Sequence, residues 1–378
     1  MQMATGSERG VALAMALGAI VIIGVIVAGA VFVATQDYRM AANTVRETRA
    51  LALADLGLNR VVNDWQTSYN TSLQTGDTLK RTYNVRGGTV TVLLTRLPGP
   101  FFWAVSEGTA GGLGSQASAR RRYGTLFRLN TPQVNTLGAI TTQGQITVSG
   151  NVTVNGNDVT PTGWPSCTTQ NVAGAAISPT TTYTPNGGAV SIQGNPSVLT
   201  TSAAADTNTY FTYGGSNYQS LAATANLTYP TGLVLTGIQP IAVGAVCQVS
   251  SVPANWGDPN RASPAGACEK YFPIIHVLGD MKVTTGRGQG VLLVDGDFTA
   301  AGNFVFTGLV ITRGSFKTSG TGNKFTGAVL AANVSVDDDA TLTGNTTIQY
   351  SSCALGTVLS SSATFPKQAK ERGWVDAY

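Results

Sequence analysis

Acidic residues in the C-terminal half of the chain are the first candidates for chemistry. The stretch GVLLVDGDFTA, from Gly290, places Asp295 and Asp297 on either side of a glycine, and Asp280 lies in a similar stretch upstream. Paired carboxylates can act as acid and base in glycoside cleavage, and carboxylate oxygens can hold a hard cation. A polysaccharide-active enzyme that uses Asp280 and Asp297 is therefore one hypothesis, and a pair of structural carboxylates at turns is the alternative.

Other residues give less support to catalysis or metal binding. The run Asp337-Asp338-Asp339 could bind calcium, but it lacks the EF-hand spacing and the repeat of calcium-binding β-rolls, so a solvated turn is preferred. His276, the only histidine, lies in the apolar run IIHVL and is expected to pack between neighbouring strands rather than act as a catalytic base. The sequence contains no nucleophile elbow and no phosphate-binding loop. We expect no enzyme activity, no metal site and no cofactor.

Four cysteines are expected to form disulfides: Cys167, Cys247, Cys268 and Cys353. None belongs to a CxxC motif, and a single histidine does not supply the clustered ligands of a zinc site. An even number of cysteines suits two disulfides in an exported domain, and four cysteines allow three pairings. Cys247–Cys268 is preferred because these two are close in sequence, which leaves Cys167–Cys353 by elimination.

The composition favours β structure and turns. Only 11% of the 378 residues are charged and 45 are glycine, whereas soluble domains usually carry about 25% charged residues. The net charge of +4 permits contact with an anionic polymer without requiring one.

The elements that must position these residues begin with a long apolar segment. Residues 11–34 are uncharged and mostly apolar, and as a helix they would span about 36 Å, enough to cross a bilayer. From Gln36 to Gln66 the apolar residues recur at helical spacing without a proline. The two parts predict one helix of about 55 residues, half in lipid and half amphipathic. The predicted apolar stripe of its second half is Val45, Leu51, Leu53, Leu56, Leu58, Val61, Val62 and Trp65.

This N-terminus resembles that of type IV pilins, in particular the PilX-type minor pilins. A short leader, residues 1–10, ends in Arg-Gly before the apolar run, and the resemblance implies that a prepilin peptidase cleaves between Gly10 and Val11. The family usually carries glutamate at the fifth mature position, where this chain has Met15. In the family that absence is associated with subunits at the filament tip. Another minor position in the filament and an unprocessed membrane anchor are the alternatives.

A small antiparallel sheet is expected after the helix, within residues 35–130. Four strand-like runs, LKRTYNV, GTVTVLLTRL, FFWAVSE and RRRYGTLFRL, are separated by turn signals such as Gly87-Gly88. The pilin resemblance also implies a sheet packed on the helix. Arg120, Arg121, Arg122 and Arg128 lie in the last run and are candidate nucleic-acid contacts. A solvated basic face is the alternative.

The remaining chain contains a repeat of about 18 residues, typical of a parallel β-solenoid. Each copy has an apolar run, then glycine or asparagine at the seventh place, then a second alternating run. We interpret the glycine or asparagine as a corner that needs positive φ. The predicted inward positions are Leu292, Val294, Phe298, Val310, Phe316, Val329 and Val334. The copies start at Pro273, Gly290, Gly308, Gly327 and Gly138.

The solenoid is predicted over residues 131–350, inserted into or appended to the pilin-like part, and a sandwich of short strands is the alternative. Residues 160–272 are irregular and could hold further rungs or a long excursion. Their aromatic cluster, Tyr210, Phe211, Tyr213 and Tyr218, could stack on sugars or bases, although packing within the loop is preferred. Residues 351–378 are expected to close the solenoid or return to the sheet.

The fold class expected is therefore α+β joined to all-β, a long helix on a small antiparallel sheet plus a parallel solenoid. The resemblance implies that the chain is a minor, tip-type subunit of a type IV pilus or a related filament, and that it displays the solenoid for adhesion or DNA capture. The large competence-linked pilins that bind DNA, which the later part resembles, give the alternative of a DNA-uptake receptor. The expected partners are other pilin subunits, the prepilin peptidase, the membrane before assembly, and DNA or a surface glycan. The expected location is the inner membrane, with the C-terminal domain exported, and then the pilus.

Overall fold

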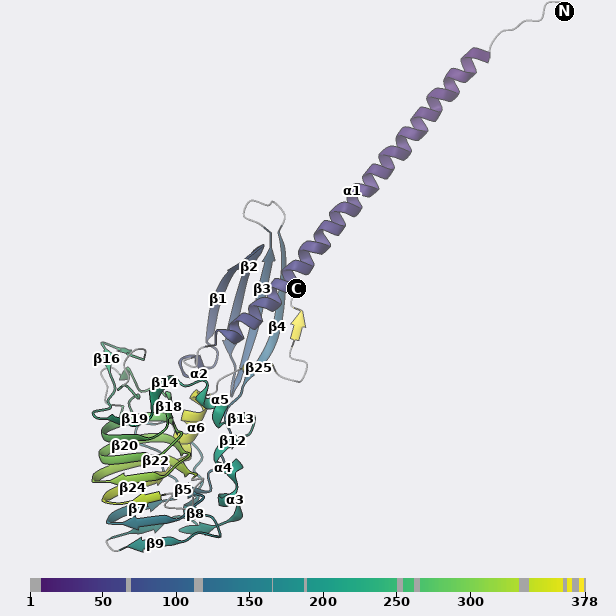
Figure 1. Ribbon diagram of the computed structural model, residues 1–378. Helices are drawn as coiled ribbons and strands as arrows, with labels where there is room; N and C mark the ends of the chain where they lie inside the picture. The colour runs from purple at the N-terminus through teal and green to yellow at the C-terminus, as the bar shows by residue number, and fades with distance from the viewer. Residues whose placement is uncertain are drawn as a thin grey trace, which may run out of the picture.

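The computed structural model has an extended shape in which a projecting helix, a small sheet and a stack of strands follow one another (Figure 1). The residues described are 8–65, 69–111, 118–164, 166–186, 189–249, 254–261, 266–332, 340–362, 366–368 and 374–376. The expected fold class is confirmed, since a long helix packs on a small antiparallel sheet and a large parallel sheet follows.

Helix α1 (Glu8–Asn63) is 56 residues long and continuous, as its apolar pattern predicted. Its end was predicted too late in the sequence. Trp65 lies beyond the helix, where its indole packs edge-on against Tyr69 and Phe102, with ring centroids 5.5 and 5.0 Å away. The chain therefore leaves the helix where Trp65 can cover the sheet.

The face of α1 that packs on the sheet is narrower than predicted and is built from small residues. Leu53, Leu58 and Val61 are buried as expected, whereas Val45 is 68% exposed. Gly57 faces the sheet so closely that a methyl group there would overlap the side chains of Val90 and Ser106. Small residues on a helix allow the helix to lie this close to the sheet. The predicted stripe contained only large apolar residues and therefore did not include them. The buried small residues of this face are Ala50 and Ala54.

The antiparallel sheet has six strands, and both of its final strands come from the C-terminus of the chain. The spatial order is β1-β2-β3-β4-β25, and β26 also pairs with β4. The residues between β4 and β25 are therefore an insertion into this sheet, which settles the choice between inserted and appended. The bounds are β1 (Thr78–Val85), β2 (Gly88–Arg96), β3 (Phe101–Ala110), β4 (Ala119–Leu129), β25 (Pro366–Gln368) and β26 (Trp374–Asp376).

The insertion is a parallel stack with three faces per turn. The repeat is confirmed by the strand register, in which Gly290 pairs with Gly308 and Gly308 with Gly327. The strands of face 1 are β5 (Gly138–Thr142), β8 (Ala173–Ile177), β11 (Val198–Thr200), β14 (Leu227–Pro230), β18 (Ile274–Leu278) and the C-terminal parts of β19 (Met281–Val294), β20 (Phe298–Thr312) and β22 (Thr321–Ala331).

Faces 2 and 3 complete each turn. Face 2 consists of β6 (Ile146–Ser149), β9 (Tyr183–Asn186), β15 (Leu233–Leu235), β21 (Phe316–Ser319), β23 (Ala340–Leu342) and the first residues of β19 and β20. Face 3 consists of β7 (Asn151–Asn155), β10 (Ser191–Gln193), β24 (Asn345–Tyr350), the middle of β19 and β20, and the first residues of β22.

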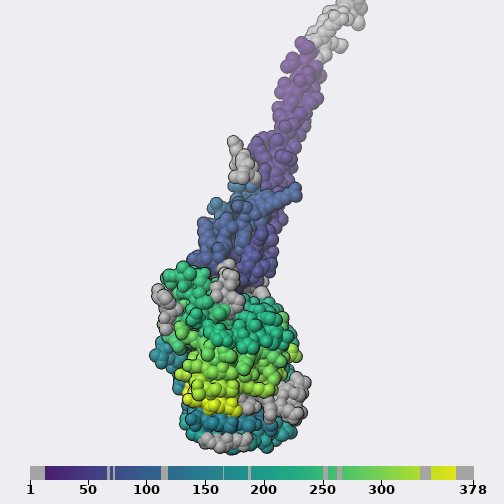
Figure 2. All heavy atoms as spheres, turned by 60° about the vertical axis from the view of Figure 1, so that its left-hand side comes forward, coloured from purple at the N-terminus to yellow at the C-terminus, as the bar shows by residue number. Residues whose placement is uncertain are grey.

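The order of the turns in space differs from their order in the sequence. Ile140 of β5 pairs with Val329 of β22, and Val152 of β7 pairs with Thr346 of β24. The first turn of the insertion thus stacks under its last turn, and in Figure 2 the blue layer lies directly beneath the yellow one. We call this contact the seam. The irregular region also contributes turns, since β8 to β11 extend the stack below the seam and β14 and β15 extend it above β18.

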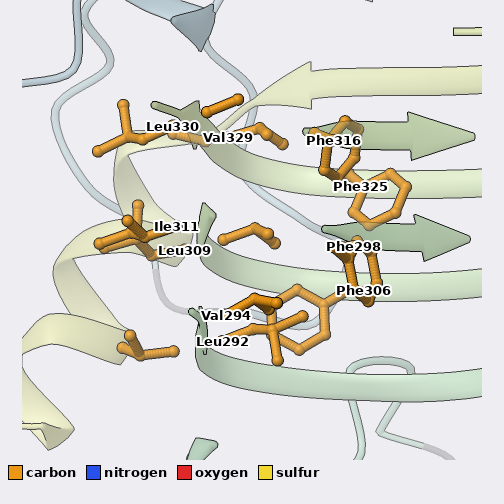
Figure 3. Close-up of a cluster of buried hydrophobic side chains, with 14 of the residues drawn as sticks. Leu292, Val294, Phe298, Phe306, Leu309, Ile311, Phe316, Phe325, Val329 and Leu330 are labelled. Atoms are coloured by element: carbon orange, nitrogen blue, oxygen red, sulfur yellow. The ribbon is translucent and has the colours of Figure 1, made fainter. Parts of the chain in front are cut away.

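Large side chains fill the interior of the stack at the predicted positions. Phe298 and Phe316 stack with centroids 5.8 Å apart, and Phe325 lies edge-on to Phe316 at 5.0 Å. Figure 3 shows Leu292 and Val294 on the same side as these rings, with Leu309 and Ile311 pointing the other way. Val334 lies outside the described residues, and Ala340 takes the place opposite Phe316.

Helices cover the outside of face 1 and explain why its strands are apolar on both sides. Helix α6 packs on β19, β20 and β22, while α3 contacts β5 and β8, and α5 contacts β18. Strands covered on both faces read as continuous apolar runs. The helices are α3 (Ser202–Ala205), α4 (Thr207–Phe211), α5 (Tyr218–Ala222) and α6 (Ser352–Ser361). The end of the chain therefore both covers the stack and returns to the sheet.

The glycine corner needs a correction. The predicted positive φ at the corner between faces 1 and 2 is found at Gly279 (φ +145°) but not at Gly296 or Gly314. Gly308, between faces 3 and 1, has φ +141° instead. A side chain on Gly308 would also overlap the carbonyl oxygen of Gly290 in the turn above. Gly314 is required for a different reason, because the carboxylate of Asp297 lies where its side chain would be.

Candidate functional site

The first half of α1 is an extended apolar surface that no other described part of the chain covers. The helix projects away from the sheet (Figure 1), and none of its most apolar window is buried. It is long and apolar enough to cross a membrane. An apolar surface of this size is unfavourable in water, so this part of α1 is suited to lipid or to the apolar helices of other subunits.

The residues of the expected processing site lie at the start of this helix. Gly10 and Val11 have helical backbone, and their side chains lie outside the described residues. Met15, at the position where pilins usually carry glutamate, is 72% exposed. The structure therefore places the expected cleavage point directly before the apolar segment.

Three of the four candidate nucleic-acid residues form ion pairs with acids of the helix and the sheet. Arg120 and Arg122 both pair with Glu107 across β3 and β4, at 3.2 and 2.6 Å. Arg121 points to the other face and pairs with Glu47 of α1 at 3.0 Å. Arg128 is six residues further along β4, about 20 Å away, so the structure does not bring it to the same cluster.

Charge is divided unequally between the two parts of the molecule. Residues 36–128 contain 12 basic and 6 acidic side chains, a net charge of +6, whereas residues 129–362 contain 7 basic and 10 acidic side chains, a net charge of −3. Between Arg128 and Asp258 the charged residues are Asp158 and Asp206. Nucleic-acid binding depends on lysine and arginine at phosphates, so the stack is poorly suited to it.

The candidate acid pair supports the corners of the stack. Asp280 Oδ1 accepts the backbone N–H of Asp297, and Asp297 Oδ1 accepts that of Ser315, both at 2.8 Å. Lys317 Nζ lies 3.1 Å from Asp297 Oδ2. Burial by itself raises the pKa of Asp297, but the Ser315 N–H and the Lys317 ammonium outweigh it, so the net shift is downward. Each carboxylate thus caps the next turn, and we call this row the carboxylate ladder.

Asp295 points away from the carboxylate ladder and fastens the covering helices. His276 Nε2 lies 3.0 Å from Asp295 Oδ2, and the Tyr218 hydroxyl donates to Asp295 Oδ1 at 2.9 Å. The expectation that His276 packs between turns is confirmed. Burial, and then the Asp295 carboxylate, raise the pKa of Tyr218, which keeps this hydroxyl a donor. Arg313 lies over the rings of Phe211 and Tyr218 and completes the cluster.

The aromatic cluster of the irregular region is internal. Tyr210, Tyr213 and Tyr218 are at most 2% exposed, and the hydroxyl of Tyr210 donates to the carbonyl of Ala204 at 2.7 Å. The preferred interpretation, packing within the loop, is confirmed, and stacking on sugars or bases by these three rings is wrong. The contact between Tyr218 and Asp295 joins residues that are 77 positions apart. The apolar–polar alternation of the sequence does not predict such a contact.

Both disulfides have the preferred pairing. Cys247 bonds to Cys268 with Cα atoms 4.9 Å apart, and Cys167 bonds to Cys353 with Cα atoms 5.5 Å apart. The second one joins the start of the insertion to the first turn of α6, across 186 residues. Within the described ranges no three His, Cys, Asp or Glu residues gather as a metal site, and Asp337-Asp338-Asp339 lies outside them.

Comparisons with known proteins give one solved structure to report. It is the competence-associated pilin ComZ from Thermus thermophilus, with 12% identity, 87% of this chain and 96% of that chain covered, and a TM-score of 0.24. At that TM-score the similarity does not establish a common fold. No protein-family model and no curated protein matches the chain.

Proposed function

We propose that the chain is a minor subunit of a type IV pilus or a related filament. The observation that carries the proposal is the continuity of α1, which is apolar and free over its first half and packed on the small sheet over its second. Such a helix can rest in the membrane and then exchange lipid for the apolar helices of neighbouring subunits. The leader that ends at Gly10 and the two disulfides support export of the C-terminal part.

We place the subunit at the tip of the filament, where the stack is displayed for adhesion. Met15 supports this position, since it cannot form the ion pair that the usual glutamate gives within a shaft. The charge of the insertion, −3, favours a ligand that is not strongly anionic. DNA uptake remains the alternative, and the net charge of +6 on the helix and sheet is what favours it.

Catalysis is not part of this proposal. Asp280 and Asp297 hold backbone N–H groups of the next turn, and Asp295 is held by His276 and Tyr218. A carboxylate used in this way is not free to exchange protons with a substrate. Polysaccharide cleavage that is lost in Asp280→Asn, with the stack intact, would overturn this part.

Processing at Gly10 tests the proposal. We expect Gly10→Ala to leave the leader on the chain and the protein in the membrane, absent from sheared filaments. Gly18→Ala is the matched control, because it makes the same change further along α1 where nothing lies within 4 Å. A Gly10→Ala protein that is cut and enters filaments like the wild type would refute the proposal.

A further inference from the structure

The arginines at the membrane-proximal end of the sheet form a surface that the filament function does not use. We define the basic collar as Arg39, Arg46, Arg49, Arg86, Arg120 and Arg122. The first three follow the apolar segment on α1, Arg86 lies at the turn between β1 and β2, and the last two lie on β4.

Contacts between helix and sheet bring these arginines to one level. The guanidinium of Arg49 lies over Gly87, next to Arg86. The ion pair between Arg121 and Glu47 holds the upper part of β4 beside the same stretch of α1. The collar therefore surrounds the helix where the sheet begins.

Acidic residues do not neutralise the collar. The acids near it are Asp37, Glu47 and Glu107; Glu47 pairs with Arg121, and Glu107 is shared by Arg120 and Arg122. Among the described residues, no carboxylate forms an ion pair with Arg39, Arg46, Arg49 or Arg86. Those four arginines are left to bind an anion from outside the chain.

The distance from the apolar segment identifies that anion. Arg39 lies four residues after Thr35, about 6 Å along the helix, which is within the headgroup layer. Arg46 and Arg49 follow at about 17 and 21 Å. These two lie beyond the headgroup layer when the helix is upright, and they approach it only when the helix tilts toward the sheet side, which lowers Arg49 and Arg86 toward a leaflet whose field reaches about 8 Å beyond its surface.

The basic residues that flank the apolar segment are concentrated on its exported side. In the exported orientation of the proposed function, on which this step rests, Arg39, Arg46 and Arg49 cross the membrane, whereas residues 1–10 contain one basic side chain, Arg9. The positive-inside rule disfavours export of such a flank.

We propose that the basic collar binds the anionic phospholipid headgroups of the leaflet from which α1 emerges. This contact tips the sheet toward the membrane before assembly. The contact between the collar and the headgroups is lost when α1 leaves the bilayer, so it exists only while the subunit is in the membrane, before assembly.

The test uses the full chain in lipid nanodiscs. A fluorophore at Thr89→Cys, an exposed position near the β1–β2 turn, reports energy transfer to a dye on the lipid headgroups. We expect more transfer in discs that contain phosphatidylglycerol than in phosphatidylcholine discs, and loss of the difference at high salt.

Matched variants separate the collar from charge in general. Arg49→Ser with Arg86→Ser should abolish the difference, whereas Lys80→Ser with Arg128→Ser, which removes two charges at the opposite end of the sheet, should keep it. Transfer that is equal in both lipids, or lost equally in both double variants, overturns the proposal. Salt-dependent binding of duplex DNA without any dependence on phosphatidylglycerol would assign the collar to nucleic acid instead. If the protein is cleaved at Gly10 and enters filaments but gives one of these contrary results, the collar proposal is wrong and the proposed function still holds.

Discussion

The carboxylate ladder predicts that Asp297 and Gly314 are energetically coupled. Ser315 is 5% exposed, and its N–H is held by Asp297 Oδ1 at 2.8 Å. Leaving a buried N–H without an acceptor costs about 1–3 kcal/mol. The pair with Lys317 is about 40% exposed on both sides and contributes at most about 1 kcal/mol. Asp297→Ala should therefore lower the free energy of unfolding by about 2–3 kcal/mol.

Gly314→Ala should break the same hydrogen bond from the other side. The added methyl group occupies the place of the Asp297 carboxylate and also presses on the backbone of Gly296. Because the hydrogen bond can be lost only once, the double variant should be less destabilised than the sum of the two single variants. The difference, which is the coupling energy, should be about 1–2 kcal/mol.

Native-state hydrogen exchange of the full chain measures these energies locally, at the amides of Ser315 and its neighbours on β20 and β21. Gly356→Ala serves as the control partner for Asp297→Ala, because nothing lies within 4 Å of a side chain at that helical position. It should stabilise α6 by about 0.5–1 kcal/mol and be additive with Asp297→Ala. If the destabilisations by Asp297→Ala and Gly314→Ala add to within about 0.5 kcal/mol in the double variant, the two residues are not coupled and the role given to the carboxylate ladder is wrong.

Three further changes test other parts of the fold. Cys353→Ser should destabilise the turns below the seam by about 2–5 kcal/mol and make residues 138–200 the first to be cut by protease; unchanged cleavage would show that the seam holds without the disulfide. Gly57→Val should separate α1 from the sheet, because the new methyl groups overlap two side chains, and unaltered protection of β2 and β3 would contradict that. Since the folded pKa of Asp297 is below 3.8, its ionised form stabilises the protein above about pH 4. The stability difference between wild type and Asp297→Asn should shrink as pH falls through 3.8 and below, and a difference that persists would show that hydrogen bonding alone accounts for it.

The elements that follow from local pattern could be predicted from the sequence. The apolar run before Thr35 and the absence of proline after it predicted one long helix, which is present. The repeat fixed the register of consecutive turns, so that Gly290, Gly308 and Gly327 pair as aligned. Alternation along each run identified Phe298 as an inward position. In each case the signal lies within a few residues of the element.

Contacts between distant parts of the chain could not be predicted in the same way. The seam joins β7 to β24 about 190 residues later, where Gln349 and Asn155 share an amide hydrogen bond of 3.1 Å. A repeat shows that turns stack, but it does not show which turn is beside which when the chain leaves the stack and returns. The role of Gly314 was misjudged for a similar reason, since its restriction comes from a side chain of the preceding turn and not from its own φ.

The topology of the insertion bears on how the stack can act as a display. Both of its ends lie at the sheet, and the joint is specific, since the Asn70 amide donates to the Ser361 carbonyl at 3.0 Å and accepts from Trp65 at 3.1 Å. Trp65 follows α1 and Ser361 ends α6, which packs on face 1. A load on the stack therefore reaches α1 through packed elements, not through a single flexible linker. Because the charge of the stack is opposite in sign to that of the helix and sheet, a membrane that attracts the collar does not attract the stack, which is left free to meet a ligand.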